Sequence, residues 1–262
     1  MKAVFLVFDN KFKKFFLKKY IALRTRGSFK ENIVIITNRE FSSLLVKFLC
    51  LFDKKVCVYK FPEIVFTKEA AASLSQLKDT RFTSKKFQFH KLNIFRHELK
   101  KYKKVFCMDI NMKINFDINP FFDLIEDNKL IASYDGDEDL KRKLKSQFDE
   151  SHKEFANLSN EYDLETYEYF QSGLLLFNTS IINRSIVEDI TKLINRYPLS
   201  ITNEQGYLNI YFLYKNPKFV PLQNFKNELF YTFWHHENNR YIITKRDVDY
   251  RYYLQRNISP KD

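Results

Sequence analysis

The chain has 262 residues, of which 45% are hydrophobic and 29% charged, and its formal net charge is +12. This length and composition exclude a disordered chain and are typical of one large folded domain. Only four glycines are present, Gly27, Gly136, Gly173 and Gly206, which excludes a glycine-rich phosphate loop. No repeat and no Pro-rich or Ser-rich linker marks a boundary, so we expect a single domain over 1–262.

The first sixty residues alternate between short apolar runs and helical patterns. The predicted strands are 3–8, 32–37 and 56–59, and the predicted helices are 11–26 and 41–52. Strands that are joined by helices form right-handed crossovers in a mainly parallel sheet. We therefore expect residues 1–125 to form a nucleotide-binding half.

The rest of the chain continues the alternation. The predicted helices are 84–101, 179–197 and 204–214, and the predicted strands are 105–109, 129–133, 173–178 and 229–234. Thr179 or Ser180 is placed to cap the second of these helices. Residues 135–159 are acidic and turn-prone, which indicates a loop or a surface helix over a site instead of core, and a candidate mobile lid. We expect 126–240 to form the second half of the domain and 241–262 a basic aromatic C-terminal segment.

The positive charge leaves a basic nucleic-acid-binding protein open as one alternative. The lysines are scattered, however, and pairs such as Lys13-Lys14 and Lys18-Lys19 are typical of solvated helix surfaces. No helix-turn-helix, zinc-finger or aromatic RNA-binding signature accompanies them. We therefore expect no nucleic-acid partner.

Cysteine use and hydropathy indicate the compartment. Cys50, Cys57 and Cys107 lie in apolar runs without metal-finger spacing, which predicts buried free thiols in a reducing environment. No apolar run reaches the length of a signal peptide or a membrane span, so the sequence predicts a cytoplasmic protein. Arginines and tyrosines mix in 245–256, a composition that allows peripheral contact with a membrane surface or a partner.

The segment 105–114, VFCMDINMKI, delivers Asp109 and Asn111 to the carboxyl end of an apolar strand. Ligands of open α/β sheets collect at these strand ends. Mn²⁺ and Mg²⁺ prefer oxygen ligands, and a cation shared with a diphosphate needs only one or two of them from the protein. The spacing therefore indicates nucleotide chemistry, although an aspartate that caps a turn after a strand explains the same residues equally well.

The block 89–124, FHKLNIFRHELKKYKKVFCMDINMKINFDINPFFDL, resembles the central block of glycogenin-like glycosyltransferases, in which Thr-Lys-Leu precedes a strand ending in Asp-x-Asp. The segments YFQSGLLLFN at 169–178 and NEQGYLNIYF at 203–212 resemble that family's Asn-Ser-Gly strand and Asp-Gln helix start. The resemblance covers about 82–212. It implies an α/β GT-A fold, family 8-like, with a Rossmann-like mixed sheet flanked by helices.

The resemblance also implies an activity. Such enzymes move a sugar from a nucleotide diphosphate donor, usually UDP-linked, to a glycan, protein or lipid acceptor, with Mn²⁺ or Mg²⁺ on the diphosphate and retention of configuration. Asp109 is then the first metal ligand. Asn111 replaces the usual second aspartate, and a neutral amide oxygen should weaken metal affinity. A catalytically weak relative that keeps the fold as a nucleotide-sugar binding module is therefore a second alternative.

The same resemblance assigns further site residues. His235 or His236 matches the histidine that completes the family's metal site, and Arg240 replaces its phosphate-binding lysine. Glu204, Gln171 and Asp135 are expected near the donor sugar and the acceptor, as the catalytic group. The donor-binding residues implied are Phe8, Asp9, Asn10, Phe12, Lys91, Asp109, Ile110, Asn111 and Arg240.

Several of these residues have an ordinary structural alternative. Phe12 either stacks on the donor base or fills the core, since its spacing fits both. Lys91 either binds a phosphate or is a solvated helix residue. Glu204 either orients a sugar hydroxyl or only stabilises the start of a helix through its dipole.

Overall fold

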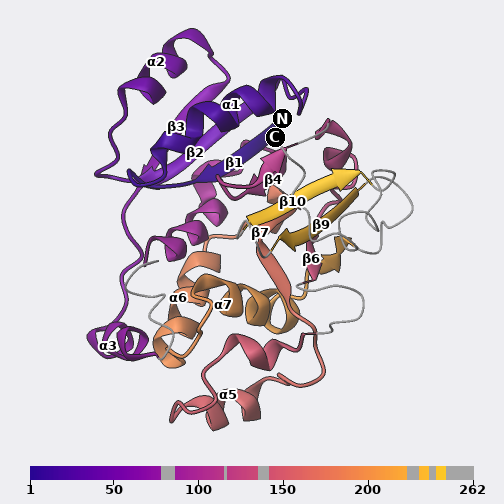
Figure 1. Cartoon of the computed structure of the whole chain (residues 1–262). Helices are drawn as coiled ribbons and strands as arrows, with labels where there is room; N and C mark the ends of the chain where they lie inside the picture. The colour runs from indigo at the N-terminus through magenta and orange to yellow at the C-terminus, as the bar shows by residue number, and fades with distance from the viewer. Residues whose placement is uncertain (78–85, 115–116, 135–141, 223–229, 236–239, 246–262) are drawn as a thin grey trace.

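The computed structural model describes residues 1–77, 86–114, 117–134 and 142–222 in full, and for 230–235 and 240–245 it describes the backbone only. Its centre is a seven-stranded sheet in the order β3-β2-β1-β4-β7-β6-β8 (Figure 1). The strands are β1 (Lys2–Val7), β2 (Asn32–Asn38), β3 (Val56–Phe61), β4 (Lys104–Met108), β6 (Leu130–Tyr134), β7 (Phe170–Asn178) and β8 (Phe219–Pro221). β1 to β4 are parallel, β7 is antiparallel to β4 and β6, and β8 is parallel to β6. The predicted α/β fold with a mainly parallel mixed sheet is confirmed.

The central strands are covered on both faces. Side chains 3–6 in β1 and 33–36 in β2 are all 0% exposed. Continuous apolar runs of this kind are typical of parallel strands that lie between two layers of helices. Their lack of alternation is therefore a consequence of burial on both sides.

Helices and short turns form the two outer layers (Figure 1). The α-helices are α1 (Phe16–Arg24), α2 (Leu44–Phe52), α3 (Lys68–Gln76), α5 (Phe155–Glu161), α6 (Ile186–Arg196) and α7 (Glu204–Ile210). The shorter helical elements are η1 (Lys13–Phe15), η2 (Lys86–Phe95), η3 (His97–Leu99), η4 (Asn119–Phe122), η5 (Leu144–Gln147), η6 (Thr179–Ile181) and the π-helical η7 (Tyr211–Lys215). α1 and α2 share an apolar cluster with Val4 and Leu6, whereas η2, α6 and α7 share one with Ala3 and Phe5. Since consecutive strand residues point to opposite faces, these two clusters lie on opposite sides of the sheet.

A second, three-stranded sheet has the order β5-β10-β9. It consists of β5 (Lys113–Ile114), β9 (Phe230–His235) and β10 (Arg240–Lys245), with β10 parallel to β5 and antiparallel to β9. The strand predicted at 229–234 is thus confirmed as β9. This sheet brings the backbone of 240–245 beside the segment that follows Asp109.

The helix predicted at 84–101 was wrong in type. Over its described part the chain forms the 3-10 segments η2 and η3. All seven residues from Phe89 to Phe95 are buried. The helix was predicted because apolar residues recur on one side of it. A segment that is buried on every side does not need such a one-sided pattern, so the spacing could not identify the type of helix.

The helix predicted at 179–197 begins only at Ile186. The Asn183 side-chain oxygen accepts hydrogen bonds from the backbone N–H groups of Ser185 and Ile186, at 3.0 and 2.7 Å. These bonds give partners to two backbone N–H groups at the start of α6 that have none within the helix. Capping by Thr179 or Ser180 was therefore wrong. The helix predicted at 204–214 is confirmed as α7 and η7.

Over the part of 135–159 that the structure describes, 142–159, the surface helix that the sequence allowed is present as α5, and only the expectation that no residue belongs to the core was wrong. This part contains η5 and α5, and Leu144, Phe148 and Leu158 are at most 3% exposed. These side chains anchor a segment that is otherwise mostly exposed or half-buried, and a lid role stays a prediction. Residues 135–141 lie outside the described residues.

Two smaller expectations also changed. Lys19, predicted on a solvated helix surface, is only 5% exposed. All three cysteines are free, but only Cys107 is buried, whereas Cys50 and Cys57 are half-buried. None of the helices within the described ranges combines the length and hydropathy needed to span a bilayer.

Candidate functional site

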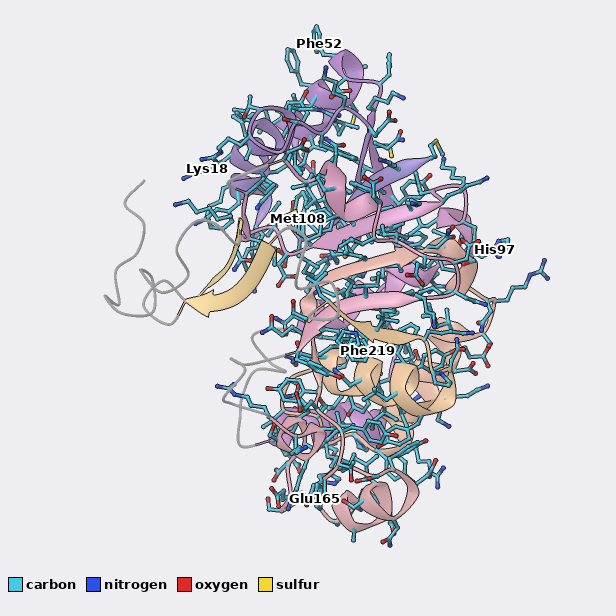
Figure 2. The ribbon with its side chains drawn as sticks, turned by 90° about the vertical axis from the view of Figure 1, so that its right-hand side faces the viewer. Lys18, Phe52, His97, Met108, Glu165 and Phe219 are labelled. Atoms are coloured by element: carbon cyan, nitrogen blue, oxygen red, sulfur yellow. The ribbon has the colours of Figure 1, made fainter. Side chains whose placement is uncertain are left out.

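The candidate site begins at the carboxyl ends of β1 and β4. These strands are parallel neighbours, with Leu6 opposite Met108, so the residues that follow each strand meet at one edge of the sheet. Met108 lies near the middle of the molecule in Figure 2. The N–H of the next residue, Asp109, donates to the Gly173 carbonyl of β7 at 2.9 Å. Asp109 is therefore held by the sheet at the predicted strand end.

Lys91 lies at the centre of the site. Its Nζ donates to Asp109 Oδ1 at 2.8 Å and to the Ser172 carbonyl at 3.1 Å. It also lies 3.5 Å from Glu204 Oε1. Three segments that are far apart in the sequence are thus joined by one ammonium group. Lys91 is 7% exposed, so the alternative of a solvated helix lysine was wrong.

Lys91 stays charged despite its burial. Burial alone lowers the pKa of a lysine, but the Asp109 and Glu204 carboxylates outweigh that effect and raise the pKa of Lys91 above its ordinary value. The ammonium group in turn compensates the charges of these two carboxylates, so the cluster has no surplus positive charge to attract an anion. A phosphate at this site would therefore need a further cation, which the exposed side of Asp109 could hold.

Glu204 opens α7 and is 2% exposed. Its Oε1 accepts a hydrogen bond from the Ser172 hydroxyl at 2.9 Å, while its Oε2 has no hydrogen-bond partner among the described residues. Burial raises the pKa of Glu204, against the opposing effects of Lys91 and Ser172. A buried acceptor without a partner is rare and is a place where a ligand hydroxyl could bind.

A set of amides fixes α7 against β7. Gln171 is 6% exposed, and the next residue, Ser172, donates its N–H to Gln205 Oε1 at 2.9 Å. Asn209 accepts from the Phe170 N–H and donates to the Phe170 carbonyl, both at 2.8 Å. Because these bonds pair the strand with the helix, they hold Gln171 and Glu204 on facing elements.

Ser172, Gln205 and Asn209 had no predicted role. Ser172 is next to Gln171 and Gln205 is next to Glu204, whereas Asn209 follows Gln205 by four residues, about one helical turn. Only their hydrogen-bond partners in the fold show that they support the site, and spacing along the sequence does not reveal those partners.

Four residues that were predicted to contact the nucleotide-sugar donor lie in the loop after β1, and the structure gives them different surroundings. Phe8 is 1% exposed and packs on Phe16 and Phe41, with ring centroids 5.5 and 5.6 Å apart. Phe12 is 44% exposed, so the alternative in which it fills the core was wrong. The structure thus gives Phe8 a packing role and leaves Phe12 accessible.

Asp9 and Asn10 shape that loop. Asp9 Oδ1 accepts from the N–H groups of Lys11 and Phe12 at 2.9 and 3.3 Å, which forms a turn. Asn10 donates to the Glu40 carbonyl and accepts from the Ser42 N–H, both at 3.1 Å. These bonds tie the end of β1 to the loop that leads into α2.

Two further polar residues near this edge were not found from the sequence. Thr37, near the end of β2, is 0% exposed, and its hydroxyl has no hydrogen-bond partner among the described residues. His90 precedes Lys91, is 3% exposed, and stacks on Phe87 with centroids 4.7 Å apart. Burial lowers the pKa of His90, which favours a neutral ring.

The predicted metal site depends on the oxygen ligands that Asp109 and Asn111 can offer. The side chain of Asp109 is 37% exposed even though one oxygen binds Lys91, and Asn111 is exposed, whereas Ile110 is 6% exposed. A carboxylate and an amide oxygen fit a hard divalent cation that also binds a diphosphate. Within the described ranges no three or more His, Cys, Asp or Glu side chains are grouped to hold an ion without such help.

The remaining predicted site residues are Asp135, His235, His236 and Arg240. Asp135 and His236 are outside the described residues. His235 ends β9 and Arg240 begins β10, and their backbones are paired across the second sheet. Their side chains are not described, so their ligand roles stay predictions.

No protein-family model matches this sequence, and no curated protein is significantly similar to it. Solved structures do match. The galactosyltransferase LgtC, in complex with donor and acceptor sugar analogues, superposes with a TM-score of 0.54 at 15% identity over 84% of this chain and 73% of its own. Core-mannan synthase A from Aspergillus fumigatus, in its Mn/GDP form, gives 0.53 at 11% identity over 85% and 73%.

The mannosyltransferase Ktr4p from S. cerevisiae gives a TM-score of 0.52 at 10% identity, over 85% of this chain and 68% of its own. The fold is that of the GT-A glycosyltransferases. At these identities the similarity establishes the fold, and the narrower resemblance to glycogenin-like enzymes stays a prediction.

Proposed function

We propose that this protein transfers a sugar from a UDP-sugar, with a divalent cation, to a glycan, protein or lipid acceptor. The observation that carries the proposal is the buried Lys91, held between Asp109 and Glu204 at the carboxyl edge of a GT-A sheet. Ligands of α/β sheets bind at this edge. A partly exposed carboxylate can share a divalent cation with a diphosphate, and a buried acceptor without a partner can bind a sugar hydroxyl, so together they suit a sugar diphosphate.

Each site residue has a proposed role that follows from its chemistry. Lys91 orients Asp109 and compensates the charges of Asp109 and Glu204, and the Ser172 carbonyl holds its ammonium group in place. Asp109 and Asn111 would hold the cation, which neutralises the charge on the leaving diphosphate when it is bound. Glu204 Oε2 would accept a hydrogen bond from a sugar hydroxyl, and the Gln171 amide would accept from or donate to another. The family resemblance implies retention of the anomeric configuration.

Neutralising Asp109 tests the proposal. We expect Asp109→Asn to lower Mn²⁺-dependent transfer or hydrolysis of the UDP-sugar at least about a hundredfold, because it removes charge from the site where the leaving group departs. Asp123→Asn is the matched control, since Asp123 has a 76% exposed side chain outside the site. The reading is refuted if both variants keep full activity.

The neutral Asn111 specifically favours the alternative of a binding module. A panel of nucleotide sugars with Mn²⁺, followed by thermal unfolding, separates the two. A ligand at a thousand times its dissociation constant stabilises the fold by about 4 kcal/mol. Stabilisation by a UDP-sugar without any turnover would identify a binding module, and no stabilisation by any donor would reject both.

A further inference from the structure

The outer face of α2 is apolar and exposed. Leu44, Phe48, Leu51 and Phe52 are 83%, 56%, 67% and 72% exposed. They recur at the spacing of one helix face, while Val46 on the opposite face is 2% exposed. Phe52 extends from the top of the molecule in Figure 2. An apolar face of this size is uncommon on a protein surface that meets only water.

The neighbouring helix α1 extends this face. Arg24 in α1 pairs with Asp53 just after α2 at 2.7 Å, and Lys13 donates to the Ser42 carbonyl just before α2 at 3.1 Å. Both ends of the two helices are therefore tied together. Four more exposed apolar side chains come from this part of the chain: Phe12, Phe15, Leu17 and Ile21. We call these four, together with Leu44, Phe48, Leu51 and Phe52, the α1–α2 face.

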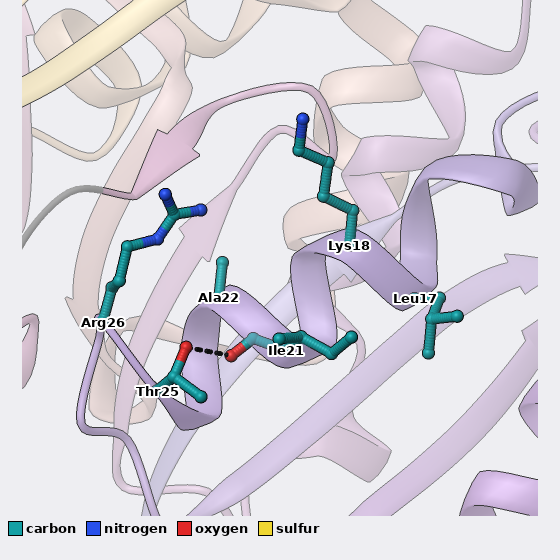
Figure 3. A pocket seen from close by; sticks show the side chains of 6 residues that line it. All are labelled: Leu17, Lys18, Ile21, Ala22, Thr25 and Arg26. Atoms are coloured by element: carbon teal, nitrogen blue, oxygen red, sulfur yellow. Dashed lines mark hydrogen bonds between the residues drawn. The ribbon is translucent and has the colours of Figure 1, made fainter. Parts of the chain in front are cut away.

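One edge of this face is hollowed. A shallow hollow of about 370 Å³ is lined by Leu17, Lys18, Ile21, Ala22, Thr25 and Arg26. In Figure 3 Lys18 and Arg26 extend on the same side of α1, and Ala22 lies between them. An apolar floor with two cations at its rim suits a ligand that is anionic at one end and apolar at the other.

The charge around the face is strongly positive. Residues 11–55 contain twelve Lys and Arg against three Asp and Glu, a formal charge of +9 out of +12 for the chain. Lys11, Lys14, Lys18 and Lys47 are exposed on or beside α1 and α2. Docking of two copies through this face would bring like charges together, which is unfavourable. An anionic partner is complementary to it.

We propose that the α1–α2 face docks on the surface of a membrane that contains anionic phospholipid. The apolar side chains enter the boundary between headgroups and acyl chains, and the surrounding lysines bind lipid phosphates. The hollow between Lys18 and Arg26 accepts a headgroup. This property goes beyond the proposed sugar transfer and does not depend on it.

Vesicle co-sedimentation with the full-length protein tests the proposal. We expect binding to vesicles of phosphatidylcholine and phosphatidylglycerol, weaker binding at high salt, and little binding to phosphatidylcholine alone. Phe48→Ser/Phe52→Ser should lower the partition coefficient at least about tenfold, because two large apolar side chains are lost. Lys11→Gln/Lys14→Gln/Lys18→Gln should lower it by roughly a hundredfold, at about fivefold per lysine.

Matched controls exclude general effects of the substitutions. Val65→Ser changes an apolar residue that is 80% exposed outside the face, and Lys153→Gln changes an exposed lysine near α5. Both should bind vesicles like the wild type. Equal thermal unfolding of all variants shows that folding is intact.

Three results would overturn the proposal. The first is no binding of the wild type to anionic vesicles. The second is loss of binding only with Arg251→Glu/Arg256→Glu, which would assign membrane contact to the C-terminal segment instead. The third is a wild-type dimer in solution that Phe48→Ser/Phe52→Ser makes monomeric, which would make this face an interface between copies.

Discussion

Lys19 is a charged residue placed where the fold cannot easily accept its charge. It is 5% exposed on the inner side of α1, and burial lowers its pKa from 10.5 to about 7, with Asp109 acting in the opposite direction. The unfolded chain therefore binds a proton at Lys19 more tightly than the folded chain does. Stability must rise with pH across this range, because folding releases that proton.

Replacing Lys19 with methionine removes this cost and keeps the side-chain volume. A shift from 10.5 to about 7 corresponds to a maximum of about 5 kcal/mol, since one pKa unit is worth about 1.4 kcal/mol. We expect Lys19→Met to raise the free energy of unfolding by about 4 kcal/mol at pH 7 and by only about 2 kcal/mol at pH 9.

Urea unfolding at several pH values measures this difference. Lys18→Met on the exposed side of the same helix is the control and should change stability little at any pH. A constant gain for Lys19→Met at pH 7 and pH 9 would refute the titration argument. A loss of stability at both values would show that the Lys19 charge stabilises the fold.

Two further substitutions test how α7 is held. A Cβ at Gly206 would lie 2.7 Å from Ser200 Oγ and 3.0 Å from Phe148 Cζ, so Gly206→Ala should lower stability by about 1 to 3 kcal/mol by overpacking; an unchanged unfolding midpoint would contradict this. Asn209→Leu should lower stability by about 2 to 4 kcal/mol, because the N–H and C=O of Phe170 lose their partner in a buried place. Hydrogen exchange at the Phe170 amide should also become faster, and protection as in the wild type would count against this role for Asn209.

The sequence by itself determined the sheet and the position of Asp109. The parallel strands are apolar throughout because both faces are buried, and such runs are visible without any knowledge of their partners. The strand end at Asp109 followed from the same pattern. The cap of α6 was predicted wrongly, because Asn183, and not Thr179 or Ser180, accepts a hydrogen bond from the first backbone N–H of the helix.

Only the tertiary structure decided which residues meet. Lys91, Asp109, Ser172 and Glu204 are separated by up to 113 positions, yet hydrogen bonds and two ion pairs join them. Spacing along a chain specifies which face of an element a side chain occupies, but contacts between elements depend on how those elements pack. For the same reason the sequence could place Lys19 on a helix but could not show that its charged end is buried.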